Sequence, residues 1–179
     1  MLVLRLTPGH ATAYRALMLE AYALHPDAFT STVAERVDLP LSWWAARMTD
    51  APNANEAVSG AFVDGTLAGV AGIRFETREK AAHKATLFGM YVPRRFRKLG
   101  LGRGLVDAIL NHAKTRSNAL LVQLTVTAGN APAQRLYESC GFVPFGNEPL
   151  AVRVGSTYVS RIHMWCSLRP PPAPPHVER

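Results

Sequence analysis

The sequence lacks any long hydrophobic run. It contains no stretch of 18 or more uncharged apolar residues, the length expected of a transmembrane helix. Residues 1–6 alternate in character instead of forming the hydrophobic core of a secretory signal. These absences predict a soluble, unsecreted protein that works in the cytoplasm and has no membrane partner.

Cysteine is scarce as well. The two cysteines, Cys140 and Cys166, form neither a C-x-x-C pair nor a disulfide-rich framework. Two buried free thiols are the favoured interpretation, and one disulfide between them is the alternative. The six histidines are scattered, without an H-x-x-x-H pair or a Cys-His cluster, so the sequence indicates no metal site.

Two common nucleotide-binding patterns are also missing. A Walker loop needs a Lys-Ser or Lys-Thr pair after its glycines, and none occurs. A dinucleotide-binding G-x-G-x-x-G could begin at Gly100, but Leu105 stands at the third glycine position and no acidic residue closes a strand about 20 residues further on. The sequence therefore excludes ATP binding by a Walker loop and argues against a Rossmann site.

Positive charge, by contrast, is in excess. The 179 residues include 20 Lys and Arg against 13 Asp and Glu, a net charge of +7 that attracts acidic ligands. Four of these cations lie within five residues: Arg94, Arg95, Arg97 and Lys98. Nucleic acid is one candidate partner, but it is disfavoured because no zinc finger or RNA-binding aromatic motif accompanies the charge.

The basic cluster lies between a predicted strand and a predicted helix. Residues 85–92 are apolar enough for a buried strand, which Pro93 ends because it cannot donate a ladder hydrogen bond. An amphipathic helix to about residue 116 follows, with an apolar residue at every fourth position: Leu101, Leu105, Ile109 and Ala113. Gly100 and Gly102 let the backbone approach an anion at the start of that helix, so the segment predicts an anion-binding loop.

Two motifs carry a family resemblance. The R-x-x-G-x-G formed by Arg97, Gly100 and Gly102 resembles the acyl-coenzyme A pyrophosphate loop of the GNAT superfamily of N-acetyltransferases. Residues 130–142, N-A-P-A-Q-R-L-Y-E-S-C-G-F, match that superfamily's second motif, N-x-x-A-x-x-L-Y-x-x-x-G-F. Independently of the resemblance, Asn130 is a good helix N-cap and Gly141 a suitable helix end, which predicts a short helix between them.

The resemblance implies an α/β fold of the GNAT-like, αβ-sandwich type. We expect a mixed central sheet of about seven strands flanked by about four helices within residues 1–168, and an extended or disordered proline-rich tail over 169–179. The parallel strands 85–92 and 120–127 would splay apart, and Gly89 suits a bulge there. The other expected elements are strands at 3–6, 57–63, 67–76, 142–145 and 156–168, helices at 7–25 and 41–48, a loop at 146–150, and a less regular segment over 27–40.

The resemblance also implies a cosubstrate, acetyl-CoA or a longer acyl-CoA, and a set of residues that bind it. These residues are Met90, Tyr91, Val92, Arg97, Lys98, Leu99, Gly100, Leu101, Gly102, Arg103, Asn130, Ala133 and Tyr137. Phe29, Trp43 and Trp44 would form the wall that receives the acceptor amine, a small molecule or a protein. The protein would be a monomer or a homodimer.

The implied reaction is direct attack of a primary amine on the thioester. A backbone N–H near Met90 or Tyr91 would stabilise the oxyanion, and Tyr137 would be the general acid for the departing thiolate. The strand 85–92 contains no acidic residue, so the general base is assigned to Glu76, with Glu20 and Asp27 as substitutes. The alternatives are a non-catalytic acyl-CoA-binding module and a basic domain that binds nucleic acid or protein.

Overall fold

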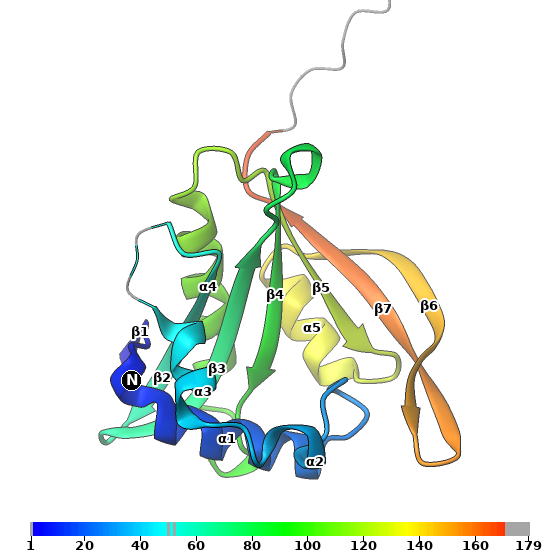
Figure 1. Ribbon diagram of the computed structural model, residues 1–179. Helices are drawn as coiled ribbons and strands as arrows, with labels where there is room; N and C mark the ends of the chain where they lie inside the picture. Colours follow the sequence, from blue (N-terminus) through cyan, green and yellow to red (C-terminus); the bar gives the residue numbers. More distant parts are fainter. Residues whose placement is uncertain (1, 50, 52, 171–179) are drawn as a thin grey trace, which may run out of the picture.

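A single mixed sheet organises the chain (Figure 1). In the computed structural model, which describes residues 2–49, 51 and 53–170, seven strands follow the order β1-β2-β3-β4-β5-β7-β6. Their bounds are β1 Leu2–Arg5, β2 Glu56–Val63, β3 Thr66–Phe75, β4 Lys84–Tyr91, β5 Leu121–Thr127, β6 Val143–Val154 and β7 Thr157–Ser167. Among these seven strands of the described residues, only β4 and β5 pair in parallel. The predicted α/β class with about seven mixed strands is confirmed.

Helices cover both faces of the sheet. The α-helices of the described part of the chain are α1 Ala11–Leu24, α2 Val33–Arg36, α3 Leu41–Ala45, α4 Leu101–Lys114 and α5 Ala131–Ser139. Short 3-10 turns lie at Pro8–His10, Ala46–Met48, Glu79–Ala81 and Arg94–Phe96. The predicted apolar stripe of α4 is buried in one hydrophobic cluster together with Tyr137 of α5. A second cluster joins α1 to Trp44 and Met48. Each cluster packs against its own side of the sheet.

β4 and β5 pair briefly and then diverge. Their register covers only the pairs Lys84–Leu121, Ala85–Val122 and Thr86–Gln123. Beyond them, three residues of β4, from Phe88 to Tyr91, advance against two of β3, which is a bulge, and Gly89 there has φ +59°. The predicted splay and the predicted bulge are both present. Figure 1 shows the gap opening toward α5.

The predicted loop at 146–150 is wrong, because these residues belong to β6. The register of β6 with β7 shifts between Pro144 and Gly146 and again between Glu148 and Val152. Glycine and proline are typical of loops, but bulges accommodate them inside an edge strand. The segment 27–40, expected to be irregular, contains the one-turn helix α2, which begins on a Thr32–Glu35 capping box.

Both cysteines are free, as favoured from the sequence, with Cys166 buried and Cys140 half-buried. Arg169, assigned to the tail, lies against the end of α4, where its Nη1 donates to the Ser117 carbonyl at 2.9 Å. Residues 171–179 of the predicted tail lie outside the described residues.

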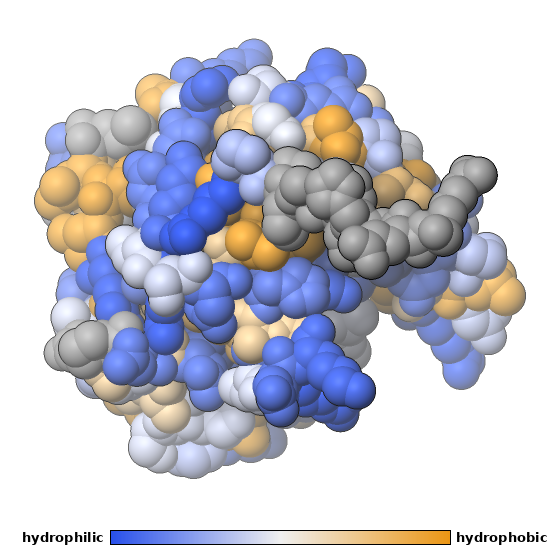
Figure 2. Space-filling model, turned by 90° about the horizontal axis from the view of Figure 1, so that it is seen from above, coloured by the Kyte–Doolittle hydropathy of each residue, from blue (hydrophilic) through white to orange (hydrophobic). Residues whose placement is uncertain are grey.

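One end of the molecule is mainly hydrophilic, with separate hydrophobic patches between the polar residues (Figure 2). Among the helices of the described residues, none has both the length and the apolar character needed to cross a bilayer.

Candidate active site

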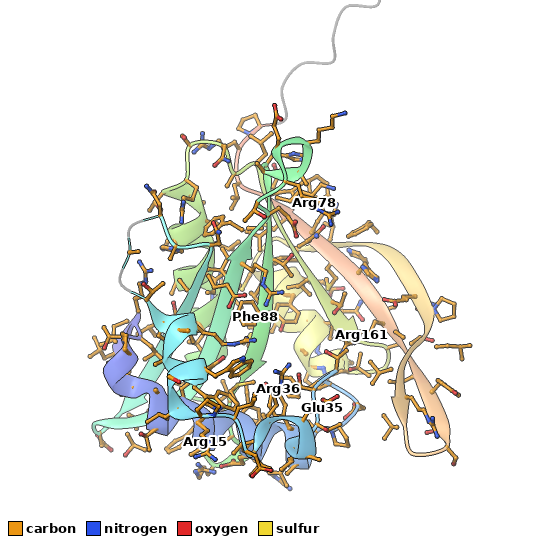
Figure 3. The ribbon with its side chains drawn as sticks, viewed as in Figure 1. Arg15, Glu35, Arg36, Arg78, Phe88 and Arg161 are labelled. Atoms are coloured by element: carbon orange, nitrogen blue, oxygen red, sulfur yellow. The ribbon has the colours of Figure 1, made fainter. Side chains whose placement is uncertain are left out.

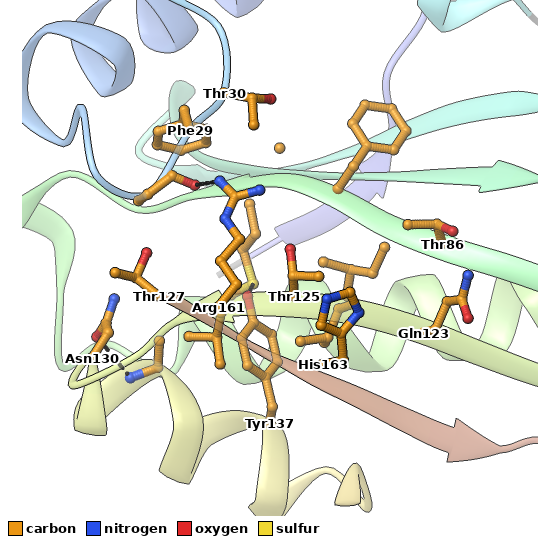
Figure 4. Close-up of a pocket in the computed structure, with 18 residues that line it drawn as sticks. Phe29, Thr30, Thr86, Gln123, Thr125, Thr127, Asn130, Tyr137, Arg161 and His163 are labelled. Carbon is orange, nitrogen blue, oxygen red and sulfur yellow. Dashed lines mark hydrogen bonds between the residues drawn. The ribbon is translucent and has the colours of Figure 1, made fainter. Parts of the chain in front are cut away.

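The gap between β4 and β5 holds a cavity of about 340 Å³ (Figure 4). Residues 86–90 of β4 and 123–127 of β5 form its walls, and α5 and β7 close it. A second cavity of about 360 Å³ continues from it to Arg97. The two share Met90, Asn130 and Tyr137 among their lining residues, so they are adjoining parts of one cleft.

The basic loop, residues 94–100, leads into α4 through residues with left-handed backbone. Lys98 has φ +66° and Gly100 has φ +76°. The first bond of the helix runs from the Gly104 N–H to the Gly100 carbonyl at 3.1 Å, so helix geometry leaves the N–H groups of residues 101–103 without intrahelical acceptors. A Cβ on Gly100 would meet no atom within 4 Å. The loop therefore offers an anion open space beside unpaired donors.

Gly102 has a different environment from Gly100. A Cβ placed on Gly102 would lie 2.9 Å from Cδ2 of Leu136 and 3.4 Å from Cε of Met90. This glycine therefore lets α4 approach α5 closely. The side chain of Leu101 is buried in the core, so only its backbone can face the loop. Arg103 turns toward α5 and donates to the Ser139 carbonyl at 3.3 Å.

Arg97 lies where the cleft meets the basic loop. Its Nε donates to the Val92 carbonyl at 3.2 Å, and its Nη2 lies 3.4 Å from Nε2 of His25. It also lines an open basic cavity of about 710 Å³ with Arg94 and Arg95. A phosphorylated ligand in the cleft would meet these guanidinium groups first.

Glu20, a substitute for the general base, is held in an ion pair. Arg95 Nη1 donates to Glu20 Oε1 at 2.9 Å, and the Tyr91 hydroxyl donates to the same oxygen at 3.0 Å. The Arg95 hydrogen bond lowers the pKa of the Glu20 carboxyl. A carboxylate with a lowered pKa accepts protons weakly, so the structure disfavours Glu20 as a base.

The spacing within the second motif brings three residues to one wall of the cleft, all on or next to α5. Asn130 caps the helix, accepting the Ala133 N–H on its Oδ1 at 3.3 Å. The buried Tyr137 hydroxyl donates to Sδ of Met90 at 3.4 Å across the cleft. Burial raises the pKa of Tyr137 to about 12, so its phenol keeps its proton throughout the physiological range.

Three other predicted residues lie away from the cleft, whereas Phe29 lines it. The Glu76 N–H donates to the Lys84 carbonyl at 3.1 Å. Because Lys84 is five residues before Gly89, Glu76 lies beside a point about 16 Å from Gly89 along β4. Among the described residues, neither cavity of the cleft includes Glu76 in its lining. Trp44 is 1% exposed in the core, and Trp43 is half-buried beneath two arginine side chains.

Several lining residues were not anticipated: Gln123 and Thr125 of β5, and Arg161 and His163 of β7. Nε2 of His163 lies 2.8 Å from Oε2 of Glu148, and its ring lies beside Thr125, its partner in the sheet (Figure 4). Arg161 Nη2 donates to the Ala28 carbonyl at 3.1 Å. The signal in the sequence was two polar residues two positions apart in an apolar strand, a spacing that places both on one face.

Comparison with known proteins identifies the family. The protein-family model described as "Acetyltransferase (GNAT) family" matches residues 16–142. The chain belongs to the GNAT family. The matched range contains the basic loop and the whole of the second motif, so both sequence motifs belong to the GNAT acetyltransferase domain.

Relatives of the GNAT chain agree in sequence and in fold. The L-amino acid N-acetyltransferase AaaT of Escherichia coli K12 is 30% identical over 122 residues, which are 68% of this chain and 73% of the relative. A GNAT acetyltransferase structure from Streptococcus pneumoniae has a TM-score of 0.81 at 23% identity, covering 93% of this chain and 98% of that one. The acetyltransferase yncA of Salmonella typhimurium, solved with its cofactor acetyl-CoA, has a TM-score of 0.79 at 20% identity and covers 97% of both chains.

The predicted family and the predicted N-acetyltransferase activity with acetyl-CoA as cosubstrate are thereby confirmed. The residues of the cleft also fit acetyl-CoA. Its elongated shape suits the second cavity, which runs from the Arg97 side chain to Tyr137, and the open backbone at Gly100 suits the pyrophosphate.

We expect Arg97→Ala to raise the Michaelis constant for acetyl-CoA roughly 10-fold, the loss typical of one hydrogen bond to a charged group. Steady-state kinetics with acetyl-CoA and with its dephospho derivative measure the effect. A larger loss with acetyl-CoA places the side chain on the 3′-phosphate, and equal losses place it on the pyrophosphate. The control is Arg78→Ala, an exposed arginine near the opposite end of β4 (Figure 3). An unchanged Michaelis constant for both cosubstrates would show that Arg97 is not part of the binding site.

Proposed function

We propose that the protein transfers an acetyl group from acetyl-CoA directly to the primary amine of a small-molecule acceptor, with both bound together in the cleft. One observation carries this proposal. The bulge at Gly89 and Met90 lies where β4 leaves β5, directly opposite the hydroxyl of Tyr137. The pantetheine arm would occupy the second cavity, and the acceptor would enter through the first.

The backbone of β4 can supply the oxyanion donor. Its pairing with β5 ends at Thr86, so the edge of β4 from Phe88 onward faces the cleft without a ladder partner from β5. In the proposed reaction the amine nitrogen attacks the thioester carbon, and a backbone N–H near Met90 or Tyr91 holds the negative oxygen. Such donors are already fixed in the strand and need no rearrangement during the reaction.

Collapse of the tetrahedral intermediate breaks the C–S bond. We assign Tyr137 as the general acid that gives its proton to the departing thiolate, after which the tyrosinate regains a proton from solvent. The burial of Tyr137 and its contact with Met90 Sδ support this role, because both keep a protonated hydroxyl inside the cleft.

The attacking amine must also lose a proton. We assign His163, in place of Glu76, as the general base that accepts this proton, because the His163 ring lines the cavity and Glu76 does not. The Glu148 carboxylate lies 2.8 Å from Nε2 of His163 and orients the ring. Nδ1 is then the ring nitrogen left to accept the proton of the amine. A base oriented by a carboxylate is a common catalytic arrangement.

His163→Gln is expected to lower kcat/KM roughly 10-fold near pH 7, less than the usual effect of an acid–base residue, since water in this half-exposed position replaces the imidazole in part. Glu148→Gln keeps the imidazole and weakens only the contact that orients it, so it should lower kcat/KM less than His163→Gln does. An unchanged kcat/KM in His163→Gln would rule out this role.

The transfer itself is tested by release of free thiol from acetyl-CoA with a panel of amines. Amino acids should be tried first, because the relative AaaT is named an L-amino acid N-acetyltransferase. Calorimetric binding of acetyl-CoA without turnover on any amine would favour a non-catalytic acyl-CoA-binding module instead. Since acetyl-CoA is a metabolite of the cytoplasm, we infer that the enzyme works there.

A further inference from the structure

A separate arginine-lined cavity adjoins the bulge. It measures about 270 Å³ and shares Phe29, Thr30, Phe88 and Gly89 with the first cavity of the cleft, the one between β4 and β5. Its other lining residues come from four elements and the segment before α2: Tyr14, Met18, Tyr22, Ser31, Arg36, Arg47 and Arg74. Figure 3 shows Arg36 between α2 and the strand that carries Phe88. The cavity therefore begins beside the proposed thioester position and ends among arginines.

Two of these arginines are fixed against one indole ring. Cζ of Arg47 lies 4.3 Å from the ring centroid of Trp43, and Cζ of Arg36 lies 4.6 Å from the same centroid. The two guanidinium carbons are thus within about 9 Å of each other, the largest separation that these two distances allow. Nη2 of Arg36 also donates to Oγ of Ser31 at 3.1 Å. Stacking on an aromatic face holds a guanidinium group in place and leaves its N–H groups free for a ligand.

The charge of this pair is not neutralised within the described part of the chain. Arg74 has its own partner, Glu56, at 2.6 Å. Within residues 2–49, 51 and 53–170, no carboxylate oxygen lies within 4 Å of Arg36 or Arg47. Like charges held close together beside aromatic rings repel each other, and a bound anion would relieve that repulsion. Burial raises the pKa of Tyr14 to about 12, so its neutral hydroxyl adds another potential donor for an anion.

We propose that the acceptor is an amino carboxylate, whose carboxylate binds Arg36 and Arg47 while its amine reaches the thioester beside Gly89. This inference rests on the proposed function and names its substrate class. A planar carboxylate matches the fork of a guanidinium group and forms two parallel hydrogen bonds with it. Phe29, Phe88 and Tyr22 supply apolar walls for the remainder of the molecule. Free amino acids, above all those with apolar side chains, fit this description.

Matched acceptor pairs test the proposal. Phenylalanine is compared with 2-phenylethylamine, and methionine with methioninamide, by thiol release from acetyl-CoA. We expect each carboxylate to raise kcat/KM about 100-fold over its neutral partner, since an analogue that lacks it leaves the half-buried guanidinium donors unpaired. Arg47→Gln and Arg36→Gln should each lower kcat/KM for the acids about 10- to 100-fold and change the neutral amines less than threefold. Arg78→Gln is the control outside the cavity.

Three further measurements separate binding from folding and from turnover. Arg47→Lys keeps the charge but loses the fork, and it should recover part of the activity on the acids. Calorimetric titration of acetyl-CoA should give the same affinity in every variant. Titrating phenylalanine and 2-phenylethylamine into wild-type protein and Arg47→Gln tests the carboxylate site without any turnover.

The outcomes are distinct. Equal acetylation of acids and neutral partners, or equal losses on both in Arg47→Gln, would overturn the amino-carboxylate assignment and leave the acetyltransferase proposal intact. Higher kcat/KM with phosphoethanolamine than with any carboxylate would also overturn it, in favour of a phosphate. Arginine-dependent binding of phenylalanine without thiol release from any amine would support the carboxylate site and contradict the proposed function.

Discussion

Tyr137→Phe is expected to lower turnover about 100-fold or more, the usual cost of losing one acid catalyst, and to leave the affinity for acetyl-CoA nearly unchanged. Phenylalanine keeps the ring that packs against Phe142, with centroids 5.9 Å apart, and removes only the hydroxyl beside Met90. Because the pKa of Tyr137 is raised to about 12, the turnover of the wild-type enzyme should not fall through ionisation of this phenol below about pH 10. Steady-state kinetics and a calorimetric titration of the cosubstrate measure the two quantities.

The matched control is Tyr158→Phe, which removes a hydroxyl from an exposed tyrosine on β7. It should leave both turnover and affinity as they are. Turnover of Tyr137→Phe within about twofold of wild type would refute the acid role and assign thiolate departure to water or a backbone donor. A loss of cosubstrate affinity without a loss of turnover would make Tyr137 a positioning residue.

Gly102→Val should destabilise the fold by roughly 1–3 kcal/mol, the range for overpacking a well-packed interface. The new Cβ would lie 2.9 Å from Leu136 Cδ2, and the two methyl groups extend further toward α5 and Met90. For a chain of this size the melting temperature should fall by about 2–12 °C. Acetyl-CoA binding should weaken as a consequence, because α5 carries the Asn130 and Tyr137 side of the cleft.

Gly100→Ala provides the contrast. Its Cβ meets no atom within 4 Å, but its φ of +76° is strained for any residue with a side chain, at a cost of about 1–2 kcal/mol. The loop can relieve this strain by moving. The free energy of acetyl-CoA binding should therefore weaken by more than the free energy of unfolding falls. A Gly102→Val variant with wild-type melting temperature and severely weakened acetyl-CoA binding would instead return Gly102 to direct contact with the phosphates.

The sequence predicted the features that depend on neighbouring residues. The four-residue spacing from Leu101 to Ala113 predicted the buried face of α4, and Asn130 was identified as a helix cap because an N-cap side chain bonds to an N–H three residues ahead. Gly89 was linked to a bulge because glycine tolerates backbone that other residues do not. Each of these inferences needs only a few consecutive residues and the geometry of one element.

Features assembled from distant segments were not predictable in this way. The aromatic support that Trp43 gives to Arg36 joins two helices, and the contact of His163 with Glu148 depends on how β6 and β7 pair. Gly102 was assigned to the phosphate because its motif suggested it, whereas its closest neighbour is a side chain on another helix. No spacing along the chain encodes such contacts.

The bulge in β4 also determines on which face of the sheet each later side chain lies. Ala85 and Leu87 face the cluster that includes α4 and α5, and beyond the extra residue Met90 and Val92 face it too, whereas Tyr91 joins the cluster that includes α1. The parity of the strand thus changes within a single residue. Deleting one residue here would exchange the two faces, turning Met90 away from Tyr137 and Tyr91 away from Glu20, with no change in composition. The chemistry of the cleft therefore constrains the length of β4 as strictly as it constrains the identity of any side chain.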